Sequence, residues 1–144
     1  AQISGVTFYN DSKATNIGAT IAAITGFAKN LTGKLIILIG GRAKQEDFSK
    51  LFFLLETINH QLILFGESVE KILSFSKSPR NYILADTIQS ATDVAFSESK
   101  YGDIVLLSPS CSSHDMFSSF EERGDVFRES VLTLSKKVKS EVIH

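Results

Sequence analysis

The sequence predicts an α/β domain with a mostly parallel sheet of five or six strands and helices on both faces. Four short runs, at 35–39, 62–65, 82–84 and 104–107, are continuously apolar, which is typical of strands covered on both sides. Segments with helical spacing separate them, so strand and helix alternate about every 20 to 26 residues, the rhythm of right-handed βαβ units. We therefore expect a Rossmann-like domain of three layers.

The first half of the chain is expected to contain two strands and two helices. A strand at 6–9 is followed by a helix, because 17–27 carries apolar residues at intervals of four, three and three. The strand at 35–39 comes next. The second helix repeats the apolar stripe over 48–55, and Asp47 is placed to cap it.

Three further helices are predicted in the second half. A short apolar stripe at 69–73 follows Gly66, and Asp86, with Gln89 three residues later, resembles a capping box before a stripe at 91–95. The last helix is expected to carry one apolar side, interrupted at Gly124 and formed by Phe117, Phe120, Phe127, Val131 and Leu134. Strand order does not follow from these patterns, and the first or last segment is free to run antiparallel.

Composition limits the classes of function. A chain of 144 residues, 43% hydrophobic and 22% charged, fits one soluble domain, residues 1–144. A net charge of -1 argues against nucleic acid or an anionic membrane as partner, and the longest apolar runs are far too short to cross a bilayer. The single Cys111 fits a reducing, cytoplasmic setting and is expected to be a small packed residue. Because the chain starts at Ala1 beside a strand, we expect a piece of a longer protein.

Ligands of open α/β sheets bind beyond the carboxyl ends of the strands. The residues just past the predicted strands combine three cations, a glycine pair and many hydroxyls: Asn10, Asp11, Ser12, Lys13 and Thr15; Gly40, Gly41, Arg42 and Lys44; Gly66 and Glu67; Asp86; and Ser108 to His114. Each turn alone reads as a helix cap with solvated cations. Taken together, these turns favour an anion site of backbone N–H groups and lysines.

Several sharper motifs are absent or weak. Gly33-Lys34 does not complete a phosphate-binding loop, and Gly40-Gly41 lacks the dinucleotide-binding spacing. Ser113-His114-Asp115 contains the residue types of a hydrolytic triad, but sequence neighbours rarely converge as a triad must. Cys111 and His114 have no second pair to complete a zinc site. The segment 121–123 reads most simply as a solvated helix face.

Three motifs resemble the C-terminal domain of the Mur ligases, in the form of the members that add D-glutamate. They are G-V-T-F-Y-N-D-S-K-A-T-N at 5–16, I-G-G-R-A-K with D-F at 39–48, and L-L-S-P-S-C-S-S, then D, F, F-E and R-G, at 106–124. The resemblance covers roughly 5–134. Ser110 and Ser112 stand where alanine is common, and His114 stands where an apolar residue is usual, which leaves a backbone contact there.

The resemblance implies a role for each motif residue. Lys44 and the Ser113 hydroxyl would hold the side-chain carboxylate of D-glutamate. Thr15 and the backbone near His114 would assist them, and Phe120 would flank the pocket. Lys13 would act as the catalytic residue near the reacting phosphate and carboxylate, and Asp11 would accept hydrogen bonds from the ATP ribose.

The resemblance also implies the reaction and the partners. ATP phosphorylates the carboxylate of UDP-N-acetylmuramoyl-L-alanine, and the amine of D-glutamate attacks the acyl phosphate in peptidoglycan biosynthesis. The uridine-binding and ATPase domains, with the Mg²⁺ ligands, would lie outside this chain; no metal is expected in it, and we expect a monomer, inactive as an isolated fragment. Two alternatives stay open, namely another amino-acid ligase such as a folylpolyglutamate synthetase, or a non-catalytic anion-binding module.

Overall fold

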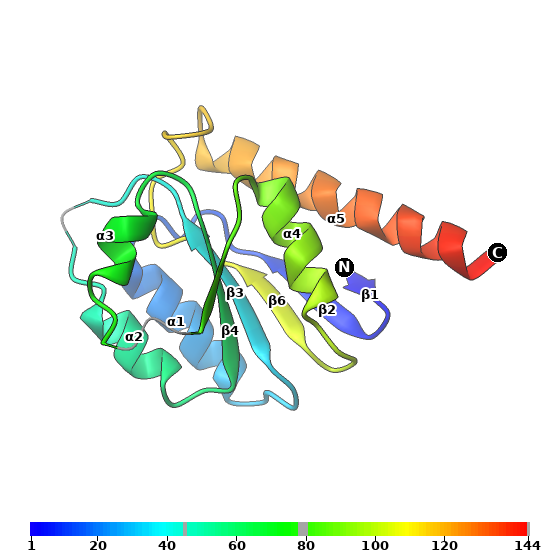
Figure 1. Ribbon diagram of the computed structural model, residues 1–144, viewed down its shortest axis with the longest axis horizontal. Helices are drawn as coiled ribbons and strands as arrows, with labels where there is room; N and C mark the ends of the chain where they lie inside the picture. The colour runs from blue at the N-terminus through cyan, green and yellow to red at the C-terminus, as the bar shows by residue number, and fades with distance from the viewer. Residues whose placement is uncertain (45, 78–80, 144) are drawn as a thin grey trace.

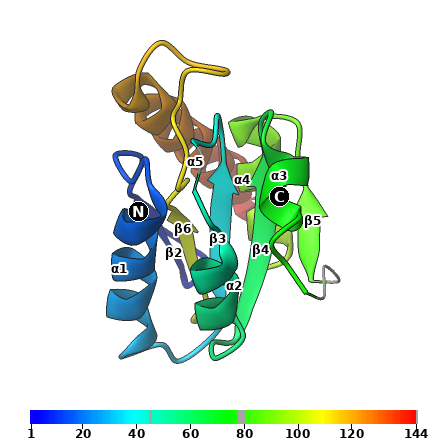
Figure 2. The same ribbon diagram turned by 90° about the vertical axis from the view of Figure 1, so that its left-hand side faces the viewer.

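The computed structural model describes residues 1–44, 46–77 and 81–143, and within them a six-stranded sheet forms the middle layer. The strands are β1 (Gln2–Ile3), β2 (Val6–Asn10), β3 (Leu35–Gly40), β4 (His60–Phe65), β5 (Tyr82–Leu84) and β6 (Ile104–Leu107). Their order across the sheet is β1-β2-β6-β3-β4-β5 (Figure 1; β5 is labelled in Figure 2). Only β1 is antiparallel to its neighbour among these described strands, so the mostly parallel sheet expected from the sequence is confirmed.

Helices cover both faces of the sheet, as expected. They are α1 (Ile17–Ala28), α2 (Ser49–Leu55), α3 (Val69–Leu73), α4 (Ile88–Ser97) and α5 (Phe120–Ile143). Helices α1, α2 and α3 lie on one side of the sheet and α4 and α5 on the other (Figures 1 and 2). Apolar residues of the first three pack in one core cluster, and those of α4 and α5 pack in the other.

Strand β3 illustrates why the apolar runs are continuous. All of its residues are buried. Leu35, Ile37 and Ile39 pack with α1 and α2, whereas Ile36 and Leu38 face the α4 and α5 side. Because successive side chains point to opposite faces, a strand between two helical layers needs apolar residues at every position.

Strand β1 forms a tight hairpin with β2 that the sequence patterns did not single out. Ile3 pairs with Val6, which leaves only Ser4 and Gly5 in the turn. Both have positive φ values, 50° and 79°, as a two-residue turn requires when it matches the twist of its strands.

The predicted capping box at Asp86 is displaced by one residue. Thr87 is the N-cap of α4: its hydroxyl accepts from Ser90 N–H, and the Ser90 hydroxyl accepts from Thr87 N–H, each at 3.0 Å. Asp47 does bond the start of α2, because its carboxylate accepts from Ser49 N–H at 2.8 Å. A side-chain capping box therefore defines the start of α4, whereas the N-cap of α2 is Phe48, which makes no side-chain cap hydrogen bond, and Asp47 lies one residue before it.

The prediction for the last helix is partly wrong. Helix α5 begins at Phe120, so Phe117 lies before it and packs half-buried against the core. Phe120 itself is 39% exposed, whereas Phe127 and Val131 are buried. The apolar side of α5 therefore begins later than the phenylalanine spacing suggested. None of the helices in the described part of the chain is long and apolar enough to span a bilayer.

Candidate functional site

Three loops meet at the carboxyl ends of neighbouring strands, because β6 lies between β2 and β3. We call them the rim loops: 11–16 after β2, 41–48 after β3 and 108–119 after β6. Ser110 N–H donates to the Ala14 carbonyl at 3.0 Å. Arg42 and Ser112 exchange backbone hydrogen bonds at 2.9 and 3.0 Å. The middle loop is thus fastened to both of its neighbours.

The glycine pair after β3 allows this close approach. Gly41 has a φ of +131°, and a Cβ atom on it would lie 2.2 Å from the Ser112 carbonyl oxygen. A Cβ on Gly40 would lie 1.9 Å from the Phe65 carbonyl oxygen. A side chain on Gly40, the last residue of β3, would push β3 away from β4, and one on Gly41 would push the loop after β3 away from the loop after β6.

Arg123 lies beneath the rim loops and binds two of them to α5. Its side chain is fully buried. The guanidinium donates to the Ser12 hydroxyl at 3.0 Å, to the Ser12 carbonyl at 2.6 Å and to the Cys111 carbonyl at 2.9 Å. The interpretation of 121–123 as a solvated face is therefore wrong for Arg123. Its partners lie 111 and 12 residues away in sequence, so local charge pattern gave no signal of this contact.

Burial changes the ionisation of two groups here. It lowers the pKa of Arg123 to about 10, which still leaves the guanidinium charged at neutral pH. It raises the pKa of the Cys111 thiol to about 12, and the Arg123 charge offsets only part of that effect. Cys111 is therefore a protonated, packed residue, as expected from the sequence, and not an activated nucleophile.

Asp11 and Lys13 line one hollow at the rim. The Asp11 carboxylate accepts a hydrogen bond from the Ser108 hydroxyl at 2.9 Å, and Asp11 N–H donates to the Leu107 carbonyl. This hollow measures about 440 Å³. It is lined by Asn10, Asp11, Ser12, Lys13, Phe120, Glu121, Gly124, Asp125 and Arg128. The structure thus brings together Asp11, Lys13 and Phe120 of the predicted site.

The other predicted residues stand on the connected loops. Lys44 and His114 are exposed, Thr15 is half-buried beside the first turn of α1, and Ser113 is buried. His114 N–H donates to the Ser112 hydroxyl at 3.2 Å. These four residues do not line the hollow beside Asp11. The loops that carry them are joined through Arg42–Ser112 and Ala14–Ser110.

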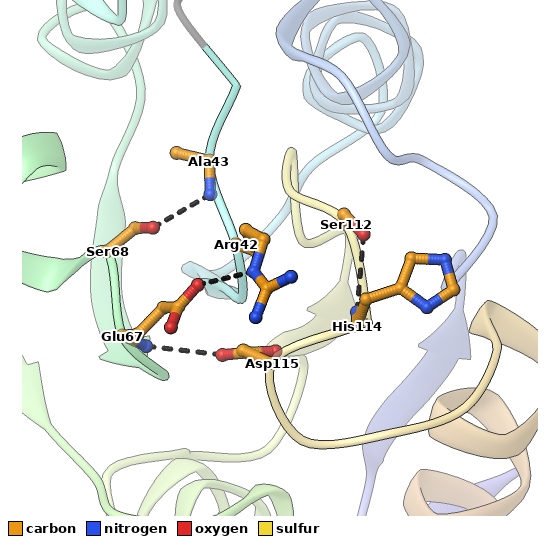
Figure 3. Close-up of polar contacts among 7 residues, drawn as sticks. All are labelled: Arg42, Ala43, Glu67, Ser68, Ser112, His114 and Asp115. Carbon is orange, nitrogen blue, oxygen red and sulfur yellow. Dashed lines mark hydrogen bonds and ion pairs between the residues drawn. The ribbon is translucent and has the colours of Figure 1, made fainter.

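Arg42 is less available to an anion than its sequence position suggested. Its Nε lies 2.7 Å from Glu67 Oε1, and this hydrogen bond and charge raise the pKa of Arg42 (Figure 3). Lys13 and Lys44 form no ion pair with another described residue. Among the three cations of the rim loops, Lys13 and Lys44 therefore offer most of the positive charge to a ligand, and Arg128 of α5 adds a cation beside the hollow.

Residues 1–111 match the protein family described as "Mur ligase, glutamate ligase domain". The chain belongs to this family. The match includes the rim loops after β2 and β3 and the start of the rim loop after β6.

Relatives named UDP-N-acetylmuramoylalanine–D-glutamate ligase support this glutamate ligase domain assignment. One, from Legionella pneumophila (strain Lens), is 42% identical over 130 residues, which is 90% of this chain and 29% of that protein. One from Pseudomonas syringae pv. tomato is 42% identical over 132 residues, 92% of this chain and 30% of that protein. One from Coxiella burnetii (strain Dugway 5J108-111) is 43% identical over 129 residues, which is 90% of this chain and 29% of that protein. The chain thus spans less than a third of the relatives it matches.

A solved structure shares the fold. It is a domain from a Haemophilus ducreyi protein described as a UDP-N-acetylmuramate:L-alanyl-gamma-D-glutamyl-meso-diaminopimelate ligase. The TM-score is 0.53 at 16% identity, and the match covers 90% of this chain and 95% of that one. The likeness to this structure is one of fold alone.

Proposed function

We propose that this chain is the D-glutamate-binding domain of an ATP-dependent ligase that adds D-glutamate to UDP-N-acetylmuramoyl-L-alanine. The observation that carries the proposal is 42% identity, over 90% of the chain, to ligases of that name. Because the chain spans 29% of that relative, we infer that uridine-binding and ATPase domains belong to the same longer protein. A cytoplasmic location and a monomeric state are part of the proposal and follow from the family resemblance alone.

D-glutamate brings two carboxylates, so its site needs cations and fixed donors. Lys44 and the Ser113 hydroxyl bind the side-chain carboxylate, assisted by Thr15 and the backbone at His114. The support is that the loops carrying them are joined by direct backbone hydrogen bonds. Phe120 stands at the edge and limits access of water to the bound amino acid.

Lys13 and Asp11 face the other two domains. The exposed Lys13 ammonium offsets negative charge as the amine of D-glutamate attacks the activated carboxyl carbon. The Asp11 carboxylate, held by Ser108, accepts hydrogen bonds from the ribose hydroxyls of ATP. Closure of this domain over ATP delivers the amine and excludes water, which would hydrolyse an acyl phosphate.

Mg²⁺ finds no suitable ligand set in the described residues, which contain no cluster of three or more histidine, cysteine, aspartate or glutamate side chains fit for a metal. We assign metal binding to the other domains of the longer protein and derive no step through it here. ATP, when bound by those domains, supplies the phosphoryl group that activates the acceptor.

The test is to express the full-length protein and measure phosphate release that requires ATP, UDP-N-acetylmuramoyl-L-alanine and D-glutamate together. We expect all three to be required, and the 144-residue chain alone to bind D-glutamate weakly and to release none. Release with a different amino acid in place of D-glutamate would favour another ligase of the superfamily. A gene that encodes no ATPase domain before Ala1 would favour the anion-binding module.

A further inference from the structure

The start of α3 holds the backbone on both sides of Lys44. The hydroxyl of Ser68, a buried residue, accepts a hydrogen bond from Ala43 N–H at 2.8 Å (Figure 3). The Lys71 ammonium donates to the Lys44 carbonyl at 3.0 Å. The Ala43 N–H group lies before the Cα atom of Lys44 in the chain, and the Lys44 carbonyl lies after it. The direction in which the lysine side chain leaves the loop is therefore set from α3.

The same turn also holds the segment 112–116. The Asp115 carboxylate accepts a hydrogen bond from Glu67 N–H at 3.2 Å (Figure 3). Gly66 makes room for that carboxylate, because a Cβ on it would lie 2.6 Å from Asp115 Oδ2 and 2.7 Å from Gly41 N. Its φ of +84° also favours glycine. Three loops therefore pack against one another around Gly66.

The contact between Arg42 and the Glu67 side chain carries less weight. The ion pair between Arg42 and Glu67 is about half exposed on both sides, and such pairs contribute little to stability. By contrast, Ser68 is only 9% exposed and satisfies a half-buried backbone N–H group. The Lys71 contact to the Lys44 carbonyl is likewise exposed, so Ser68 and Asp115 are the two side chains that contribute most to fixing the geometry.

We propose that Ser68 and Asp115 are positioning residues of the glutamate site: Ser68 sets Lys44, and Asp115 sets the Ser113–His114 segment. The inference rests on the proposed function. A dicarboxylate must meet its cation and its donors at a fixed separation, and small displacements of binding groups weaken binding strongly. The turn between β4 and α3 supplies that separation without touching the ligand.

The experiment uses the full-length ligase with Ser68→Ala and Asp115→Ala. Each change removes one hydrogen-bond acceptor, so we expect the KM for D-glutamate to rise about three- to tenfold. We expect the KM for ATP and the kcat at saturating D-glutamate to stay within about twofold of the wild type. Neither substitution changes Asp11 or Lys13, the residues proposed to contact ATP and the reacting groups. Asp115→Asn and Ser68→Thr keep an acceptor oxygen, and we expect them to restore most of the D-glutamate affinity.

Asp93→Asn and Ser97→Ala on α4 are matched controls, because both side chains are exposed and remote from the rim loops. Thermal unfolding of every variant separates a general loss of stability from a change in KM. An unchanged KM for D-glutamate, an equal rise for ATP, or an Asp115→Asn variant no better than Asp115→Ala would each overturn the positioning role. A wild-type enzyme that ligates without D-glutamate would instead overturn the proposed function itself.

Discussion

Replacing Arg123 by alanine tests whether a buried cation joins the rim loops to α5. The side chain makes three hydrogen bonds, to the Ser12 hydroxyl, the Ser12 carbonyl and the Cys111 carbonyl. Truncation leaves the Ser12 and Cys111 carbonyls in the interior without this donor, at about 2 kcal/mol each, whereas the Ser12 hydroxyl keeps its hydrogen bond to the Phe120 carbonyl and loses about 1 kcal/mol. A pKa lowered from 12.5 to about 10 corresponds to a cost of about 3 kcal/mol for burying the charge, and truncation relieves that cost.

The balance predicts a substantial loss of stability. Lost hydrogen bonds of about 5 kcal/mol, less about 3 kcal/mol of relief, plus a cavity penalty of about 1 kcal/mol, give a net loss of about 3 kcal/mol. That is a large part of the roughly 5–15 kcal/mol that stabilises a domain of ordinary size. Arg123→Lys keeps a charge but not the planar fork, so we expect a loss of about 2 kcal/mol.

Urea unfolding of the 144-residue chain, followed by circular dichroism, measures these differences. Arg128→Ala is the control, because Arg128 lies on the exposed side of the same helix in a loose 3.6 Å pair with Asp125, and should change stability by less than about 0.5 kcal/mol. In amide NMR spectra, Arg123→Ala should shift the signals of Ser12 and Cys111. A loss below about 1 kcal/mol for Arg123→Ala, or one equal to that of the control, would refute the reasoning.

Three further predictions concern the rim. In the full-length enzyme, Lys44→Ala should raise the KM for D-glutamate about tenfold or more while changing that for ATP little; equal changes would remove Lys44 from the glutamate site. Lys13→Ala should lower kcat about a hundredfold with modest changes in either KM, and an unchanged turnover would exclude Lys13 from the chemistry. Burial raises the pKa of Cys111 from 9.0 to about 12, so only the unfolded thiol ionises within that range. Stability contributed by the protonated thiol is complete below pH 9 and is lost as pH rises toward 12. The wild type should therefore lose about 1.4 kcal/mol more than Cys111→Ala between pH 8 and pH 10 in urea titrations, and parallel pH profiles would contradict this.

The parallel sheet was predictable because its signal is local. A strand with helices on both faces must be apolar at consecutive positions, and 35–39 and 104–107 are. The strand Gln2–Ile3 was missed because two residues carry no periodicity, although the Ser4-Gly5 turn before Val6 is a hairpin signal. The capping pattern of Asp86 and Gln89 missed the N-cap by one residue because Asp86 and Thr87 are adjacent residues that both cap helices well.

The site was predictable in composition but not in arrangement. Residues just past the strands could be named because parallel strands end at one edge. Which loops touch depends on strand order, and helical periodicity does not encode it. Arg123 shows the limit: beside Glu121 and Glu122 it reads as surface, and only the placement of Ser12 and Cys111 above it makes it interior. Likewise, the role of Ser68 follows from its distance to Ala43 and not from any motif.

The position of β6 between β2 and β3 has a consequence for the order of folding. Thr7 pairs with Ile104, and Leu35 pairs with the same residue, so both pairings span much of the chain. During synthesis, β2 and β3 emerge early but have no common neighbour until the last central strand arrives. Loop closure over such separations is slow and leaves apolar strand edges uncovered meanwhile.

All three rim loops depend on that late insertion. A nascent chain that stops before Ile104 already contains Lys13 and Lys44 but has no strand to bring their loops together. Ligand-binding capacity should therefore appear in a single late step, when β6 enters the sheet and α5 brings Arg123 beneath it. Until then the growing domain is two separate groups of strands, β1 with β2 and β3 with β4 and β5, whose facing apolar edges are uncovered.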